Sequence, residues 1–246
     1  MKRRIAKLCI AAFALFATAM SLVGCASTAN DPRDPFEGFN RAMFSVNEGI
    51  DVVVKPVAEG YDALVPGLVK TGVGNFFGNI ADPWIAVNNL LQGKIAEGAS
   101  DVGRVLVNST LGIVGLIDVA SDLGLEKHAE DFGQTLGKWG VGEGYYLYWP
   151  LIGPRNVRDT LGFAVDVSVD PILRAHDVSA RNTLNGVRFI DTRASLLPVD
   201  KVIEAAAFDK YNYIRNAYFQ MRRNAVHDGS PPPLDDDDDE DEDKEK

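Results

Sequence analysis

The chain of 246 residues contains side chains that serve in catalysis elsewhere, but their spacing does not match an active site. Ser100 lies in Gly98-Ala99-Ser100-Asp101-Val102-Gly103, which is one residue longer than the Gly-x-Ser-x-Gly pattern of a nucleophile elbow. The glycines at 72, 74 and 78 miss the dinucleotide-binding pattern by one position. Three histidines occur without a second histidine at metal-site spacing: His128, His176 and His227. We therefore expect neither an enzyme nor a cofactor nor a metal centre.

The spacing does indicate one modification site, Cys25, at the end of an N-terminal segment typical of secretion. Residues 2–4 are basic, residues 8–20 are apolar, and small residues follow, as in a signal peptide. Leu22-Val23-Gly24-Cys25 resembles the lipobox of bacterial lipoproteins. The resemblance implies cleavage before Cys25, a diacylglycerol thioether on its sulfur and a third acyl chain on its new amino group. The alternative is ordinary secretion with a free thiol at Cys25.

Several acyl chains on one residue would hold a soluble domain at a bilayer, because each buried methylene contributes about 0.8 kcal/mol. Ala26, rather than aspartate, follows the cysteine. In lipoproteins of two-membrane bacteria, this resemblance implies the outer membrane rather than retention at the inner one. The other cysteine, Cys9, lies within the signal peptide, so the mature chain has no disulfide available.

Composition divides the chain into four parts. We expect a signal peptide at 1–24, an acylated tether at 25–33, one helical domain at 34–229 and a disordered Pro-rich and acidic tail at 230–246. The formal net charge is −10, and the domain remains acidic without the signal and the tail. An acidic domain has no electrostatic footprint for nucleic acid, so we expect no such partner.

Apolar residues recur at spacings of three and four, which is the pattern of amphipathic helices. One such stripe follows Asp34-Pro35, where a helix is predicted to begin and to continue until a break at Pro56. Asp82-Pro83 predicts a second start of the same kind. The segment 95–108 places Ile95, Ala99, Val102 and Leu106 on one side. Alternation of strand type is confined to 52–54 and 165–169, so the predicted fold class is all-α.

Glycine recurs every few residues between 112 and 153, which predicts a folded-back, loop-rich region. An aromatic cluster follows within it: Tyr145, Tyr146, Tyr148 and Trp149. Tyrosine and tryptophan favour the headgroup level of a membrane, so these residues are candidate membrane-interface aromatics. The other interpretation of the cluster and of the apolar helix faces is an ordinary helical core.

Several motifs occur in an order that resembles one family. They are Asp34-Pro35-Phe36-Glu37-Gly38-Phe39-Asn40-Arg41, Asn75-Phe76-Phe77-Gly78-Asn79-Ile80 with Asp82-Pro83, Asn88-Asn89-Leu90-Leu91-Gln92-Gly93, the block from Arg104 to Asp118, and Asp131-Phe132-Gly133-Gln134-Thr135-Leu136-Gly137. The stretch Trp139-Gly140-Val141-Gly142, the segment 155–159 and a late Arg215-x-Ala217-Tyr218-Phe219-Gln220 follow. Over residues 34–222 the chain is similar to the MlaA (VacJ) family. It departs from the family pattern at Gly144-Tyr145-Tyr146 and Trp149-Pro150.

The resemblance implies an all-helical ring that lies in the inner leaflet of the outer membrane around a polar channel. Phospholipids that have strayed into the outer leaflet would pass through this channel to a soluble periplasmic lipid-binding carrier. A trimeric porin would be a second protein partner, and no chemistry on the lipid is implied. The alternative is a structural envelope lipoprotein that scaffolds a porin without moving lipid.

Such a ring needs polar side chains on its inner face. The candidate channel-lining residues are Arg41, Asn47, Asn75, Asn88, Asn108, Ser109 and Thr110. The other interpretation of each is helix capping or hydrogen bonding between helices. The candidate gate is the segment 124–144, in which glycines permit bending and Lys127 is positioned to meet a phosphate: Gly124, Lys127, His128, Gly133 and Gly144. A plain surface loop is the alternative for this segment.

Overall fold

The structure, a computed structural model, describes residues 31–233. The predicted signal peptide, Cys25 and the acidic run from Asp235 onward lie outside the described residues. The elements are, in chain order, α2 (Glu37–Leu64), α3 (Gly67–Leu91), α4 (Ile95–Thr110), α5 (Val119–Asp122), α6 (Phe132–Lys138), β1 (Tyr146–Trp149), β2 (Gly153–Asn156), α7 (Val157–Val169), α8 (Val178–Ser195), α9 (Leu197–Ala206) and α10 (Lys210–Val226). The prediction of a mostly helical, ring-like fold is confirmed.

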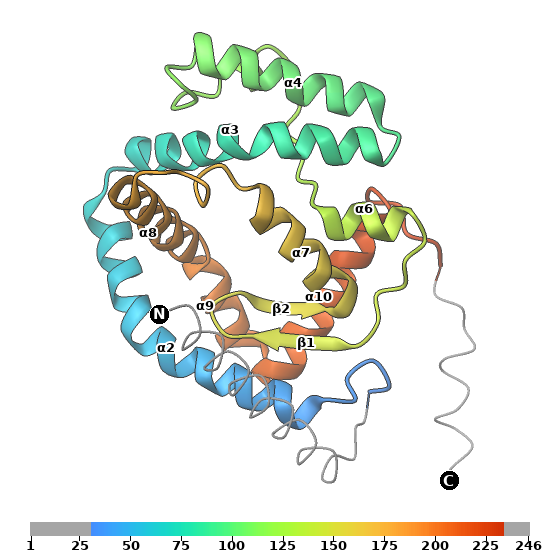
Figure 1. The fold of residues 1–246 in the computed structure, drawn as a ribbon. Coiled ribbons are helices and arrows are strands. Elements are labelled where there is room, and N and C mark those ends of the chain that lie inside the picture. Colours follow the sequence, from blue (N-terminus) through green and yellow to red (C-terminus); the bar gives the residue numbers. More distant parts are fainter. Residues whose placement is uncertain (1–30, 234–246) are drawn as a thin grey trace, which may run out of the picture.

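The helices are arranged around a central opening (Figure 1). Helix α2 follows one rim and packs on α8, while α3 closes the top and carries α4 on its outer side. Helices α6 and α7 pack together on the opposite rim, with α10 beside them. Because the loops between α2, α3 and α4 are short, this part of the ring is a continuous helical path.

The polarity of the ring is inverted in α4. Its predicted apolar stripe points away from α3, since Ile95 is 72% exposed and Leu106 is 62% exposed. The opposite face packs on α3 and is polar: Asp101, Arg104 and Asn108 are nearly fully buried. Water-soluble helices bury the apolar face instead. An exposed apolar face of this kind marks a surface that contacts lipid or another protein.

The same inversion extends around the described part of the ring. Large apolar side chains are exposed on α2 and at its junction with α3, where Val53 is 70%, Leu64 is 84% and Leu68 is 86% exposed. Polar or charged side chains that are buried outnumber buried apolar ones among the described residues. The described side chains are therefore distributed so that much of the outer surface is apolar and many contacts in the interior are polar.

A two-stranded antiparallel hairpin interrupts the otherwise helical chain. Strand β1 pairs with β2, with Tyr146 opposite Asn156 and Trp149 opposite Gly153. The two segments predicted as strand candidates, 52–54 and 165–169, lie within α2 and α7 instead. Four-residue strands are too short for the alternation to stand out, and the tyrosines of β1 had been interpreted as surface aromatics.

Two prolines that predicted helix boundaries lie inside helices. Helix α2 continues through Pro56, and α3 continues through Pro83. A proline inside a helix removes one backbone hydrogen bond and bends the axis. Figure 1 shows α2 curving along the rim of the ring, so the bend contributes to closure rather than ending the element. Asp82 is accordingly not a cap but a buried ion-pair partner.

No helix among residues 31–233 is both long and apolar enough to cross a bilayer.

Candidate functional site: the polar interior of the ring

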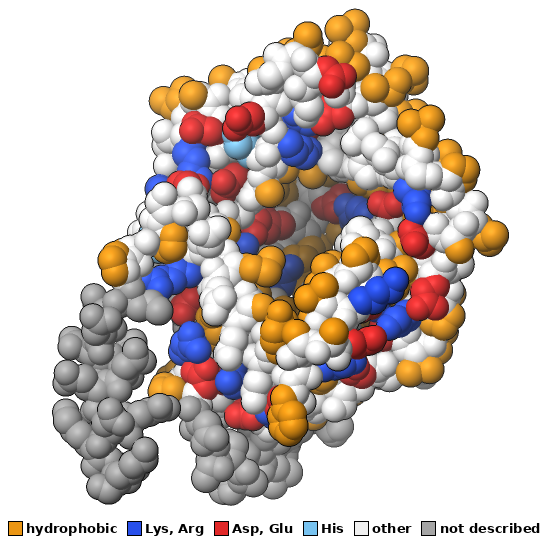
Figure 2. Space-filling model, turned by 180° about the vertical axis from the view of Figure 1, so that it is seen from behind, with side chains coloured by type: hydrophobic (Ala, Val, Ile, Leu, Met, Phe, Trp, Pro, Cys, Tyr) orange, Lys and Arg blue, Asp and Glu red, His pale blue; other side chains and the backbone are white. Residues whose placement is uncertain are grey.

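The space-filling view shows the molecule hollowed at its centre (Figure 2). Acidic and basic side chains stand on the wall of the hollow, and hydrophobic side chains gather on the outer rim. A cavity of about 550 Å³ lies between elements from different sides of the ring, namely α3, α6, α7, α8 and α10. Its lining combines apolar groups such as Phe77, Trp84 and Met221 with charged groups such as Asp131 and Arg222.

A carboxylate, Asp159, holds the α7 side of this interior to α10. Asp159 is 1% exposed and accepts hydrogen bonds from Arg158 (2.9 Å), Arg222 (2.6 Å) and the hydroxyl of Tyr218. Arg222 also donates to both oxygens of Asp131, the residue that caps α6. Burial alone would raise the pKa of Asp131, but the hydrogen bonds and charge of Arg222 outweigh it and hold that pKa below its usual range.

A second carboxylate, Asp34, connects the start of α2 to α10. Its two oxygens accept from Asn40 (2.8 Å), from the Tyr211 hydroxyl (2.5 Å) and from Arg215 (2.9 Å), and it is fully buried. Helix α2 begins at Glu37 without a side-chain cap, so Asp34 joins α2 to α10 instead of capping the helix that was predicted to begin there. The amide of Asn40 also bridges to β1 through Tyr146 and Tyr148.

A third network joins α4 to the glycine-rich loop that follows it, and Arg104 lies at its centre. Its guanidinium donates to both oxygens of Asp118 at 2.9 Å and to the carbonyl of Leu125 at 2.6 Å. Arg104 is 1% exposed, and its Nε lies 3.7 Å from Asp82. Charged groups survive such burial only when they are paired and hydrogen-bonded. The three networks show that ionic contacts join elements from different sides of the ring.

The family model described as MlaA lipoprotein matches residues 32–225 of the chain. This chain belongs to the MlaA lipoprotein family. The intermembrane phospholipid transport system lipoproteins MlaA of Shigella flexneri and Escherichia coli K12 are each 37% identical over 238 residues, covering 92% of both chains. The MlaA protein of Haemophilus influenzae is 30% identical over 224 residues, covering 86% of this chain and 88% of that protein.

A solved structure from work on the structural basis for maintenance of bacterial outer membrane lipid asymmetry has the same fold. It aligns with a TM-score of 0.68 at 35% sequence identity, and the alignment covers 78% of this chain and 98% of that chain. The identification from the ordered motifs is thus confirmed.

Every predicted channel-lining residue takes part in a hydrogen bond within the ring. Asn88 and Asn108 are corrections, because both are buried between elements: Asn88 accepts from Thr135, and Asn108 donates to Asp118. Arg41 is held by Glu37 and Asp209, and it covers the ring of Tyr211 at 4.4 Å. Asn47 accepts from Leu151 N, and Asn75 donates to the Leu116 carbonyl. Ser109 accepts from Asn79, and Thr110 donates to the Leu106 carbonyl.

The predicted MlaA gate segment is tied to the rest of the ring at two points. Lys127 pairs with Asp82, and the His128 imidazole Nδ1 lies 2.8 Å from Asp101. Gly124 and Gly144 have positive φ angles of 81° and 67°, as expected of turn glycines. Gly133 is a correction, because it is buried in α6 at the contact with Asp159 and Gly162 rather than in a hinge. Movement of the segment stays a prediction.

The aromatic cluster of this chain divides between core and surface. Tyr146 and Tyr148 are corrections, because both rings are buried in a cluster with Tyr211 and Phe219. Tyr145 is 52% exposed, and the indole of Trp149 is half-buried and donates to Thr160. Alternation along β1 explains the division, since successive side chains of a strand point to opposite faces.

The predicted tether of the MlaA chain is already part of the ring at its last residues. Asp31 is buried and forms ion pairs with Arg33 and Arg215, and the Arg33 carbonyl accepts from Tyr146 N. The folded domain therefore begins by residue 31 rather than at 34. The sequence analysis missed Asp159, Arg222 and Arg215 as closing residues. The sequence shows that these residues are charged, but their charge alone does not indicate which residues they pair with.

Proposed function

We propose that this protein is an outer-membrane lipoprotein that removes mislocalised phospholipids from the outer leaflet and passes them through the ring towards the periplasm. The observation that carries the proposal is the inverted polarity of the ring. Exposed Ile95 and Leu106 suit acyl chains, and the central cavity presents charged and apolar groups together, as a lipid with a polar head requires. The names of the MlaA relatives support the same substrate class.

The finer parts of the proposal concern location and partners. The ring lies in the inner leaflet of the outer membrane, held there by acylated Cys25 and by its exposed apolar side chains. A trimeric porin lies beside it, and a soluble periplasmic lipid-binding carrier collects the lipid. The amphipathic outer surface supports this placement, because helices with one apolar and one polar face are stable within a single leaflet.

Deletion of the gene tests the function. We expect phospholipid to accumulate in the outer leaflet, because no path returns it, and expression of the wild-type chain to reverse the increase. Ethanolamine headgroups at the cell surface are measured with an amine reagent that does not cross the membrane. Surface phospholipid that stays at the wild-type level in the deletion strain, with altered porin assembly, would support the structural scaffold instead.

A further inference from the structure

Arg155, on β2, is half-buried, and it differs from the arginines of the ionic networks in having no carboxylate partner. Its Nε is buried without a hydrogen-bond partner, and no carboxylate of residues 31–233 forms an ion pair with it. Arg104, Arg158, Arg215 and Arg222, in contrast, are each paired with at least one aspartate. Burial lowers the pKa of Arg155 from its ordinary value, which reflects the cost of holding this charge away from water.

The guanidinium of Arg155 is positioned by an aromatic ring rather than by a carboxylate. Its central carbon lies 4.1 Å from the ring centroid of Phe163 on α7. A cation over an aromatic face is attracted to it, but the ring covers only one face and leaves the N–H donors at the edge free. Phe163 therefore fixes the plane of the guanidinium without satisfying its hydrogen-bonding capacity.

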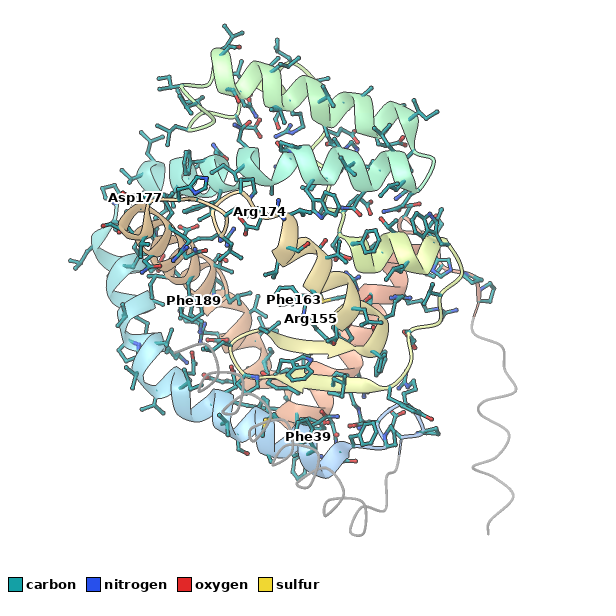
Figure 3. The ribbon with its side chains drawn as sticks, viewed as in Figure 1. Phe39, Arg155, Phe163, Arg174, Asp177 and Phe189 are labelled. Carbon is teal, nitrogen blue, oxygen red and sulfur yellow. The ribbon has the colours of Figure 1, made fainter. Side chains whose placement is uncertain are left out.

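The pair lies on the inner side of the ring. Figure 3 shows Arg155 and Phe163 next to each other between β2 and α7, with Phe189 of α8 across the central opening. The charged groups that act on Arg155 include Asp131 and Arg222, which line the central cavity.

We propose that Arg155 binds the phosphate of a phospholipid as it passes through the ring, with Phe163 holding the guanidinium in place. The inference rests on the proposed function and deepens it. A planar guanidinium matches phosphate oxygens in a bidentate arrangement, and it is less strongly hydrated than an ammonium group. Because the phosphodiester is common to glycerophospholipids, Arg155 recognises the class and does not select among headgroups.

A binding role and a structural role for Arg155 predict opposite changes in stability. A half-buried charge without a carboxylate partner does not stabilise the free protein, so we expect its replacement by an apolar side chain of similar length to be neutral or stabilising. We therefore expect Arg155→Met to unfold at the same temperature as wild type or higher. If Arg155 instead stabilised the fold, Arg155→Met would unfold at a lower temperature than the wild type.

The test uses the full acylated chain in detergent-treated vesicles that contain either photoreactive phosphatidylethanolamine or photoreactive diacylglycerol. We expect Arg155→Met to lower cross-linking to the phospholipid about fivefold to tenfold, as for loss of one charge-assisted contact, and to leave the diacylglycerol signal unchanged. Arg155→Lys should retain more of the signal than Arg155→Met. The control is Arg223→Met, which removes the same charge from a guanidinium that donates to the carbonyls of Pro232 and Pro233 and forms no ion pair with a carboxylate of residues 31–233.

Wild-type cross-linking to phospholipid in Arg155→Met would overturn the assignment, as would an equal fall with diacylglycerol or a lowered unfolding temperature. Inorganic phosphate in molar excess distinguishes the source of the phosphate. Labelling that persists assigns the site to lipid, whereas its complete loss assigns it to free phosphate and overturns the proposal. Arg155→Met that restores a normal surface in the deletion strain would reject the inference while leaving the transport function in place.

Discussion

Asp159→Ala is expected to lower the free energy of unfolding by about 3–5 kcal/mol, because it leaves a buried cation without its partner. Arg158 is 6% exposed, and Asp159 is the one carboxylate in the described residues that pairs with it. The Tyr218 hydroxyl and the Nε of Arg222 lose their acceptor at the same time. Arg222 keeps its contacts with Asp131, so the loss falls mainly on Arg158.

Urea unfolding in detergent micelles, followed by circular dichroism, measures the change. The matched control is Asp177→Ala, which removes a carboxylate that caps α8 through Ala180 N at an exposed position. Loss of a cap costs about 1 kcal/mol. Equal effects of the two substitutions would contradict the view that ionic contacts close the ring.

Gly162→Ala is expected to destabilise the ring by about 3 kcal/mol, since a single methyl group has no space between α6 and α7. A Cβ at this position would lie 2.4 Å from the backbone nitrogen of Gly133 and 2.6 Å from its Cα. Backbone atoms cannot rotate away, so the two helices would have to separate. Because Asp131 and Gln134 of this region line the central cavity, lipid removal should fall with stability.

Gly49→Ala provides the control for helix propensity. Gly49 lies inside α2, and a Cβ there would meet nothing within 4 Å. Alanine is favoured over glycine in a helix interior by about 1 kcal/mol, so this variant should be slightly more stable than wild type. Thermal unfolding of both variants in the same detergent compares their stabilities with that of the wild type. Equal unfolding temperatures of the two variants would contradict a close contact between α6 and α7 at Gly162.

Periodicity predicted the helices well but could not say which way they face. Ile95, Val102 and Leu106 form the stripe expected for α4, and the same stripe would suit a buried core. The structure turns it outward and buries Asp101, Arg104 and Asn108 on α3 instead. A hydrophobic stripe indicates only that one face of the helix is shielded from water. Lipid and protein interior are equally apolar, so the family resemblance was needed to favour a leaflet.

The interior site was less predictable than the fold because its contacts join residues far apart in the chain. Asp34 meets Tyr211 and Arg215, and Asp159 meets Arg222. No local pattern identifies such partners. Asn88 and Asn108 were correctly noticed as polar groups on apolar helices, but they proved to join helices rather than to face a passage. Arg155 lay in a quoted motif, and its lack of a partner became visible only in three dimensions.

The central claim is a water-filled passage through a ring that is apolar outside, and single cysteines test it directly. The chain suits this test because its two natural cysteines are Cys9, in the predicted signal, and Cys25, the predicted acylation site. Phe189→Cys places a thiol beside the opening in Figure 3, and Leu106→Cys places one on the exposed apolar face of α4. In intact membranes a small hydrophilic thiol reagent should modify position 189 and should modify position 106 only after detergent is added. Modification of position 106 in the membrane, with position 189 unreactive, would contradict the account.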